Sequence, residues 1–311
     1  MRKEYVNLTA YPVAPVLEIL LRDRTTGNHS IFAANDYRDA GYDIGETDEI
    51  TPEVLSLLGE NEIQPRVAKS KADQASRTKA MAEVFTPSWI CNKMNNYCDD
   101  EWFGYEGSFN TEQGQSWLVK SGTVVFPPGK TWQDYVLSKR LEITCGEAPY
   151  LVSRYDTTTG DFFATERRIG LLDRKLRVIT EQVTDEKEWC KWVYAAYQSV
   201  YGYEFQGDNL LIARINLLNT FCDYYESVWR KKATVPQLKT VAEIISWNLW
   251  QMDGLKGCVP FREPAPDAEQ MTLFGFAEEN PPDERNDTPS ECVIKDWEQN
   301  ETVIFNKLKR G

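Results

Sequence analysis

The spacing of apolar residues predicts several helices and three short strands in this chain. Between residues 208 and 229 apolar side chains recur every three or four positions, which is typical of a helix with one buried stripe, and Asp208 is placed to cap it. Similar spacing predicts further helices over 169–178, 186–199 and 237–246. Apolar runs that begin at Arg140, Val200 and Trp247 predict strands, and each run ends near an acid.

The first 80 residues are richer in turn signals than in long patterns. Thr51 at a cap, Pro52 in the first turn and Gly59 past the end predict one short helix. The run from Val16 to Leu21 fits a short buried helix or strand equally well. We therefore expect a mainly helical extension ahead of the strands.

Thr86 and Pro87 predict the start of another helix. Thr86 is placed as its cap, Pro87 suits the first turn because it has no N–H to pair, and Ile90 and Met94 then share a face. A helix start leaves unpaired N–H groups, which favour a carboxylate. The sequence thus predicts a site for an acidic ligand group beside Thr86.

Other short segments complete the predicted architecture. Residues 117–120 and 123–126, around Ser121 and Gly122, predict a β-hairpin. Residues 151–155 are expected to form the helix that crosses from the first strand to the second, and 293–306 a strand pair. Strands alternating with helices are typical of an α/β fold with a doubly wound parallel sheet.

Composition and charge narrow the classes of function. The formal net charge is −13, which argues against a chain that grips DNA phosphates alone, and the basic run 66–79 is taken as a solvated surface. Seven cysteines without a CxxC pair and a single histidine, His29, give no zinc-binding pattern. No run of about 18 apolar residues and no signal peptide is found. We expect a cytoplasmic protein with reduced thiols, no metal and no membrane partner.

Three acids, one at the start of the first predicted strand and two at the ends of the others, are expected to line the edge where α/β folds bind ligands. The turn after Glu142 has one glycine, Gly146, and so lacks the Gly-rich pattern that cradles a pyrophosphate. Glu204, at the end of the second strand, is placed to accept two ribose hydroxyls. Asp253, after the third strand, is placed to accept an adenine amino group.

These segments resemble the motifs of gamma-class DNA adenine amino-methyltransferases. Residues 141–151 are similar to the first S-adenosylmethionine motif, and Phe85-Thr86-Pro87 with Met94 is similar to the tenth. Gly202-x-Glu204, followed by a helix with Ala-Arg-x-Asn-Leu, resembles the nucleoside-recognition unit of doubly wound sheets, and Asp253 resembles the third motif of the family. The resemblance implies S-adenosylmethionine as cofactor, held by Phe85, Thr86, Pro87, Glu142, Thr144, Cys145, Gly146, Glu204, Phe205 and Asp253.

The resemblance also implies the organisation of the chain. It predicts a Rossmann-like methyltransferase sheet with an N-terminal helical extension and an inserted hairpin. The predicted parts are an extension (1–80), the S-adenosylmethionine-binding domain (81–260), an acidic linker (261–292) and a C-terminal strand pair (293–311). Glu204 lies 62 residues after Glu142 in the numbering, against about 20 in an uninterrupted unit, so the helices between them are interpreted as an insertion.

The catalytic motif of that family is missing. Amino methylation uses Asn/Asp-Pro-Pro-Tyr/Phe, in which the ring stacks on a flipped base. The nearest sequence, Asn280-Pro281-Pro282-Asp283, has no ring and lies in the acidic linker. No catalytic residue is therefore predicted. We expect the cofactor-binding subunit of a split adenine-specific DNA methyltransferase of a restriction-modification system, inactive alone, with the catalytic loop and DNA reading supplied by a partner chain.

Other interpretations stay open. Ala148, where the family usually has a second glycine, favours a non-catalytic methyltransferase-fold protein that regulates a partner or mimics DNA. A methyltransferase with another substrate is a third possibility. Gln270-Met271-Thr272-Leu273-Phe274 resembles the pentapeptide by which bacterial proteins bind the replication sliding clamp, although the same segment could fold back on its own domain.

Overall fold

A three-stranded parallel sheet lies at the centre of the protein. The computed structural model describes residues 5–34, 36–39, 41–59, 63–69, 86–264 and 290–308. The strands are β3 (Arg140–Glu142), β4 (Val200–Glu204) and β5 (Leu249–Gln251), in the order β3-β4-β5. Both pairings are parallel. The mixed α/β architecture and the three predicted strands are thus confirmed.

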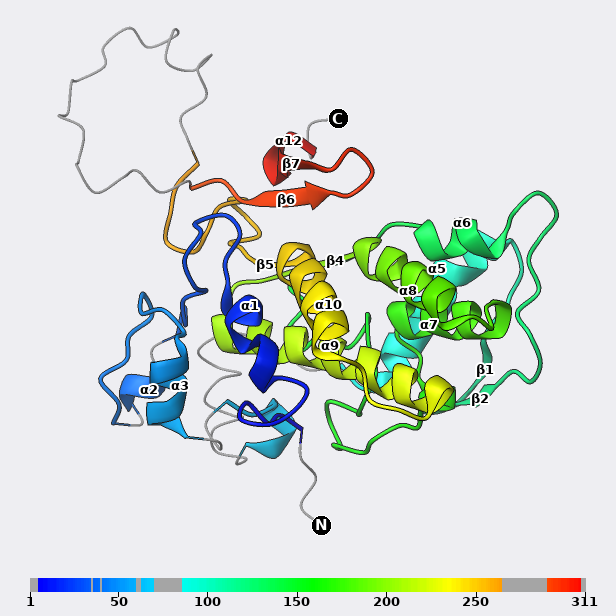
Figure 1. Ribbon diagram of the computed structural model, residues 1–311, viewed down its shortest axis with the longest axis horizontal. Coiled ribbons are helices and arrows are strands. Elements are labelled where there is room, and N and C mark those ends of the chain that lie inside the picture. The colour runs from blue at the N-terminus through cyan, green and yellow to red at the C-terminus, as the bar shows by residue number, and fades with distance from the viewer. Residues whose placement is uncertain are drawn as a thin grey trace, which may run out of the picture.

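Four helices connect these strands and cover one face of the sheet (Figure 1). The connection from β3 to β4 contains α7 (Leu171–Gln182) and α8 (Glu186–Gln198), and the one from β4 to β5 contains α9 (Gly207–Trp229) and α10 (Val235–Asn248). Val200 and Leu249 point into the large hydrophobic core shared with these helices, and both are fully buried. Alternate residues of a strand face opposite sides, so this layer takes every second side chain.

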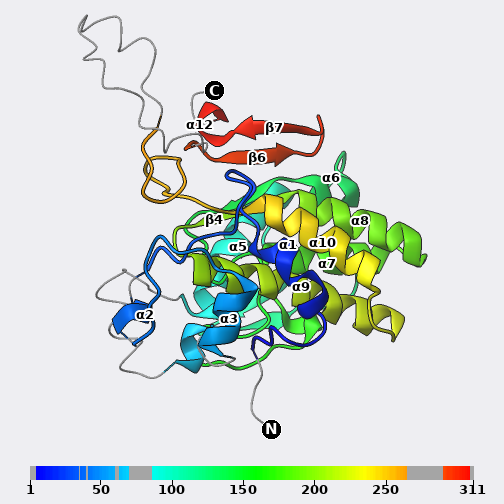
Figure 2. The ribbon, with the colours of Figure 1, turned by 60° about the vertical axis from the view of Figure 1, so that its left-hand side comes forward.

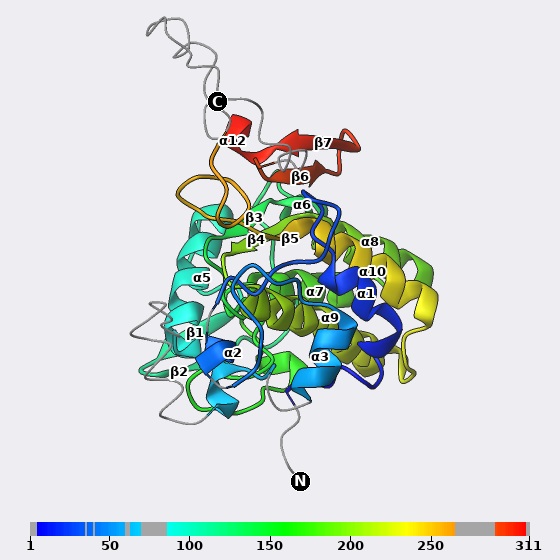
Figure 3. The same ribbon diagram turned by 90° about the vertical axis from the view of Figure 1, so that its left-hand side faces the viewer.

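The other face is covered by the C-terminal strand pair. The strands β6 (Val293–Asp296) and β7 (Glu301–Ile304) are antiparallel, as predicted, and lead into α12 (Phe305–Leu308). Phe305 packs on Tyr203 and Trp250, with ring centroids 6.0 and 5.2 Å apart. Figure 2 and Figure 3 show the sheet between this hairpin and the helices.

The N-terminal extension wraps the helical layer. It contains η1 (Ala14–Val16), α1 (Leu17–Leu21), α2 (Asp36–Asp39), α3 (Pro52–Leu58) and η2 (Arg66–Ala68). The helix alternative for the first apolar run is therefore the correct one, and α1 packs on α9 and α10. The cap of α3 is confirmed, because Thr51 Oγ1 accepts the Val54 amide at 3.3 Å.

The segment ahead of the sheet contains α5 (Ser88–Phe103), the hairpin β1 (Asn110–Gln113) and β2 (Ser116–Val119), and α6 (Trp132–Leu137). The hairpin predicted over 117–126 is wrong in register. Its turn lies at Gly114, with φ +58°, and Val124 donates its amide to Glu181 on α7 at 2.8 Å. The first strand, Asn-Thr-Glu-Gln, has no apolar alternation that could have revealed it.

The predicted crossover helix over 151–155 is also wrong. The carbonyls of Tyr150 and Leu151 accept the amides of Leu171 and Leu172, which satisfies the start of α7. The backbone of this segment is thus already used by another helix. After a loop with η3 (Thr165–Arg167), α7 and α8 themselves form the crossover, so they are not an insertion beside it.

The buried side of α5 is polar, contrary to the prediction for this helix. Met94 is 50% exposed, whereas Asn92, Asn96 and Asp99 are buried. Arg174 of α7 donates to the Asp99 carboxylate at 2.6 Å, with both side chains 1% exposed, and to the two asparagines. Tyr135 also donates to Asp99, at 3.0 Å. This network fixes α5 and α6 against α7.

We predict that Asp99→Ala strongly destabilises the protein, because it leaves the Arg174 charge buried without its partner. Breaking a buried pair in this way costs about 3–5 kcal/mol. Urea unfolding followed by circular dichroism measures the loss. The control is Lys231→Ala, which removes an exposed pair with Glu186 and should leave the midpoint nearly unchanged. A loss below about 1 kcal/mol for Asp99→Ala would contradict the assignment.

Candidate functional site

Glu142, Glu204 and Asp253 lie at the carboxyl edge of the sheet. Glu142 ends β3 opposite Gly202, Glu204 ends β4 opposite Gln251, and Asp253 follows β5 by two residues. The three acids therefore occupy successive steps along one edge. We call this edge, together with the turn over residues 144–148, the rim.

Glu142 holds the chain that follows the turn. Its side chain is 8% exposed and accepts the amides of Tyr150 at 3.3 Å and Leu151 at 3.1 Å. Burial raises the pKa of Glu142 from 4.5 to about 8, and the charge of Glu204 acts in the same direction. The two amide bonds oppose that rise. Glu142 thus fixes the backbone that follows the turn through two hydrogen bonds.

The turn itself has an unusual backbone. Thr144, Gly146 and Ala148 have φ of +46°, +53° and +62°, so two residues with side chains adopt the left-handed conformation. Cys145 lies on Gly202, where an added Cβ would meet the Cys145 sulfur at 3.3 Å. The turn therefore packs closely on β4, the middle strand. Left-handed backbone at residues with side chains is strained, and such strain is often found at ligand-binding sites.

Glu204 connects this turn to the start of α9. The side chain is 7% exposed; one carboxylate oxygen accepts the Gly146 amide at 2.8 Å and the other the Gln206 amide at 3.1 Å. Burial raises its pKa above the ordinary value. A carboxylate has about four acceptor positions, so two bonds leave room for further donors such as hydroxyls.

Asp253 and Phe205 lie on the more open part of the rim, and both are partly exposed. Asp253 Oδ1 accepts the amides of Leu255 and Lys256 at 3.0 and 3.3 Å. Phe205 meets Phe261 edge-to-face, with centroids 5.6 Å apart. Phe261 is 46% exposed and has φ +63°. Phe205 was predicted from the sequence as a cofactor-binding residue. Phe261 was not predicted, because it belongs to no recognisable motif.

The helix start at Thr86 and Pro87 differs from the prediction. The cap of α5 is Pro87, no side chain caps the helix from that position, and Thr86 uses its carbonyl to accept the Thr157 hydroxyl at 3.0 Å. The carboxylate at this helix start is Asp156, which accepts the Ser88 amide at 2.9 Å. Asp-Thr-Thr-Thr-Gly over 156–160 is typical of a turn held by its own carboxylate, and that signal could have identified Asp156. Phe85 lies outside the described residues.

The N-terminal extension reaches the rim at the start of α9. Gln251 exchanges two hydrogen bonds with Ile31, and the Gly207 amide donates to the Phe32 carbonyl at 3.0 Å. The predicted cap Asp208 is wrong, because α9 begins one residue earlier, at Gly207, with Gln206 in the cap position and no side-chain capping bond. Asp208 is instead fully buried in the first turn and accepts the Tyr37 hydroxyl at 3.1 Å. One side of the rim is thus covered by the chain's own residues.

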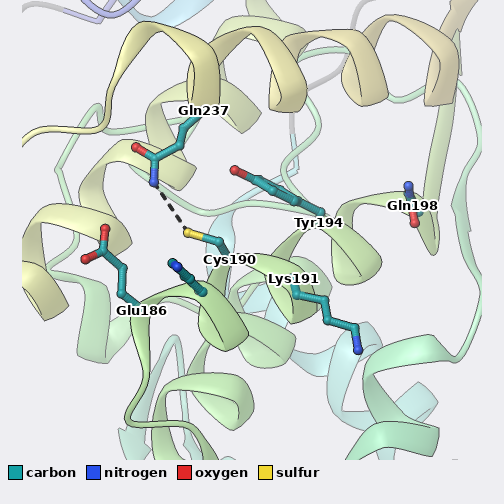
Figure 4. A pocket seen from close by; sticks show the side chains of 7 residues that line it. Glu186, Cys190, Lys191, Tyr194, Gln198 and Gln237 are labelled. Carbon is teal, nitrogen blue, oxygen red and sulfur yellow. Dashed lines mark hydrogen bonds between the residues drawn. The ribbon is translucent and has the colours of Figure 1, made fainter.

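A separate pocket lies between α8 and α10 (Figure 4). It is lined by Glu186, Lys187, Cys190, Lys191, Tyr194, Gln198 and Gln237. The Gln237 amide lies 3.5 Å from the Cys190 sulfur, and burial raises the pKa of that thiol. A thiol of this kind is protonated at neutral pH and a poor nucleophile. The pocket therefore contains no activated thiol.

The described residues contain no group of three or more His, Cys, Asp or Glu that could hold a metal ion. Over the same ranges, no helix is both long and apolar enough to cross a membrane. The sequence Asn280-Pro281-Pro282-Asp283 and the segment Gln270–Phe274 lie outside these ranges.

Searches with the sequence and the structure found no matching protein family, curated protein or solved structure.

The raised pKa of Glu142 predicts a specific dependence of stability on pH. Its folded pKa of about 8 exceeds the ordinary 4.5, so its contribution is complete below pH 4.5 and is lost as the pH rises to about 8. Glu142→Gln cannot titrate. The unfolding free energy of the wild type minus that of Glu142→Gln should therefore fall from pH 5 to 8, by at most about 1.4 kcal/mol per pH unit.

Urea titrations at pH 5, 6, 7 and 8 test this expectation. Glu298→Gln, whose carboxylate is 70% exposed, makes the same substitution outside the rim and serves as the matched control. A constant or rising difference for Glu142→Gln would show that Glu142 is ionised in its buried position.

Proposed function

We propose that this chain is the S-adenosylmethionine-binding subunit of a split adenine-specific DNA methyltransferase. The observation that carries the proposal is the assembly of Glu142, the turn over 144–148 and Glu204 on two adjacent parallel strands. Together with the sequence resemblance, this supports a Rossmann-like methyltransferase fold. The Gly-x-Glu segment and the first-motif segment, far apart in the chain, meet through the bond between Gly146 and Glu204.

The groups on the rim fit the parts of that cofactor. Glu204 would accept the ribose hydroxyls, Asp253 the adenine amino group, and Phe205 would lie against the adenine ring. Backbone groups of Thr144, Cys145 and Gly146 would line the methionine part, and Glu142 would keep their turn in place. When bound, S-adenosylmethionine supplies the methyl group that is transferred.

The proposed binding site for the methionine carboxylate has weaker support than the proposed binding site for the nucleoside. At the start of α5, the Ser88 amide already binds Asp156 at 2.9 Å. A cofactor carboxylate would have to replace Asp156 or use the neighbouring amides. We therefore propose that Thr86 and Pro87 only line the site, and that the residues that contact the nucleoside provide most of the binding energy.

The chain's charge supports the proposal that this chain binds the cofactor and a partner chain binds DNA. A net charge of −13 leaves little capacity to bind DNA phosphates directly. A partner would bring the Asn-Pro-Pro-aromatic loop and a basic DNA surface. We further propose a cytoplasmic location, and a clamp contact through Gln270–Phe274 stays a prediction.

One group of observations favours a second candidate, a non-catalytic protein that regulates a partner or mimics DNA. Ala148 adopts φ +62°, where a glycine would be unstrained, and the Gly146 amide occupies one oxygen of Glu204. Ile31 and Phe32 cover part of the rim. A permanently closed rim would bind no nucleoside, so direct titration separates the two candidates.

We predict that the wild-type protein binds S-adenosylmethionine and that Glu204→Ala binds it at least about tenfold more weakly. Hydrogen bonds to a charged acceptor contribute about 1.5–3 kcal/mol each, and about 1.4 kcal/mol corresponds to a factor of ten. Isothermal titration calorimetry measures both affinities. Glu298→Ala removes an exposed acid on the turn between β6 and β7. Its affinity for S-adenosylmethionine should equal that of the wild type.

Circular dichroism of each variant verifies that it is folded. Equal affinity of wild type and Glu204→Ala would remove Glu204 from the site. If the folded wild type gave neither binding heat nor thermal stabilisation, the cofactor role would be lost in favour of the non-catalytic candidate.

A further inference from the structure

β3 is an edge strand of the central sheet. In the part of the chain that the structure describes, β3 is paired with β4 alone. The amides of Arg140 and Cys145 donate to Ser199 and Tyr203 on the β4 side. Because backbone groups alternate along a strand, the amide and carbonyl of Leu141 point to the outer edge. This edge therefore offers a template for one more strand.

The side chains at this edge are apolar and exposed on one face. Leu141 is 47% exposed and Ile143 62%, although both follow the pattern of a buried strand. They lie on the face of Tyr203 and Trp250, which are only 8% and 1% exposed because the C-terminal hairpin covers them. One hydrophobic face is thus buried over β4 and β5 and left open over β3.

The C-terminal hairpin ends at the border of this open area. Tyr201, which pairs with Leu141, donates its hydroxyl to the Lys295 carbonyl at 3.4 Å. Lys139, just before β3, binds Glu298 on the hairpin turn at 3.2 Å. The open area, which we call the β3 shelf, therefore consists of Leu141, Ile143 and the outer side of Tyr201, continuous with a core that is already formed.

We propose that a β-strand of a second, basic protein adds to the outer edge of β3 and covers the β3 shelf. A strand is the element that satisfies the edge backbone groups and buries Leu141 and Ile143 at the same time. At the border of the shelf, Glu298 is 70% exposed and its charge is balanced by Lys139, so the choice of a basic partner rests on the chain's net charge of −13.

The direction of the added strand rests on the proposed function. A strand parallel to β3 ends at the carboxyl edge, next to the turn over 144–148. Its following residues would then lie beside the proposed methyl donor. The partner strand is therefore expected to be apolar and to be followed directly by Asn or Asp, two prolines and an aromatic residue.

Site-specific photo-crosslinking tests this docking. p-Benzoylphenylalanine is placed at Leu141 in the full chain, expressed in the cells in which the protein occurs, and cross-linked peptides are identified by mass spectrometry. Val125, which is 65% exposed in the loop between β2 and α6, is the matched control position. The expected product joins Leu141 to a strand-forming peptide of a basic protein immediately before an Asn/Asp-Pro-Pro-aromatic sequence, and Val125 does not give it.

Other outcomes overturn the proposal. These are a product that joins two copies of this chain, a peptide without that sequence, or the same products from both positions. The partner so identified is then purified, and its affinity for Leu141→Arg should be at least tenfold lower than for wild type or Val125→Arg. Equal affinities would place the partner elsewhere.

The same complex separates this inference from the cofactor assignment. If the Leu141 product forms but neither the chain nor the complex binds S-adenosylmethionine, the docking edge stands and the cofactor role fails. If the chain binds S-adenosylmethionine but Leu141 gives no specific product, the cofactor role stands and the docking edge is lost.

Discussion

Two buried acidic side chains hold the turn over residues 144–148 to the sheet, and the whole candidate site depends on this contact. Glu142 accepts amides just after the turn, and Glu204 accepts the Gly146 amide within it. Burying an acid is unfavourable unless it is hydrogen-bonded, and buried amides have the same requirement. The acids and the amides therefore satisfy each other's hydrogen-bonding requirement. As a result, the strand ends and the turn can only be stable together.

This mutual dependence explains which parts of the fold the sequence could predict. The strand β4, and helices with an apolar stripe such as α9, were identified because their side chains meet a continuous core. The strand Asn110–Gln113 was missed because it has no apolar alternation, and the polar buried face of α5 was missed because its partner Arg174 comes from a distant segment. Periodicity describes how a segment meets an apolar core, and it carries no information on polar contacts of this kind.

The candidate site shows the same division. The places of Glu142, Glu204 and Asp253 follow from strand ends, which sequence shows well. The role of Thr86 did not follow, because a Thr-Pro helix start is equally compatible with a cap from its own side chain or from a distant acid. Here Asp156, in another loop, supplies the carboxylate. Phe261 adjoins Phe205 only because the chain after β5 turns back, which no local pattern indicates.

The distribution of apolar surface bears on whether the fold is complete as a single chain. A sheet in an α/β protein is normally covered on both faces, since strand side chains alternate between them. Here the helical layer covers one face fully, whereas the hairpin covers the other only as far as Tyr201. Chance exposure of single apolar residues is common. Two such residues next to an edge that no described strand pairs, at the end where the buried acids hold the turn, are better explained by association with a second chain.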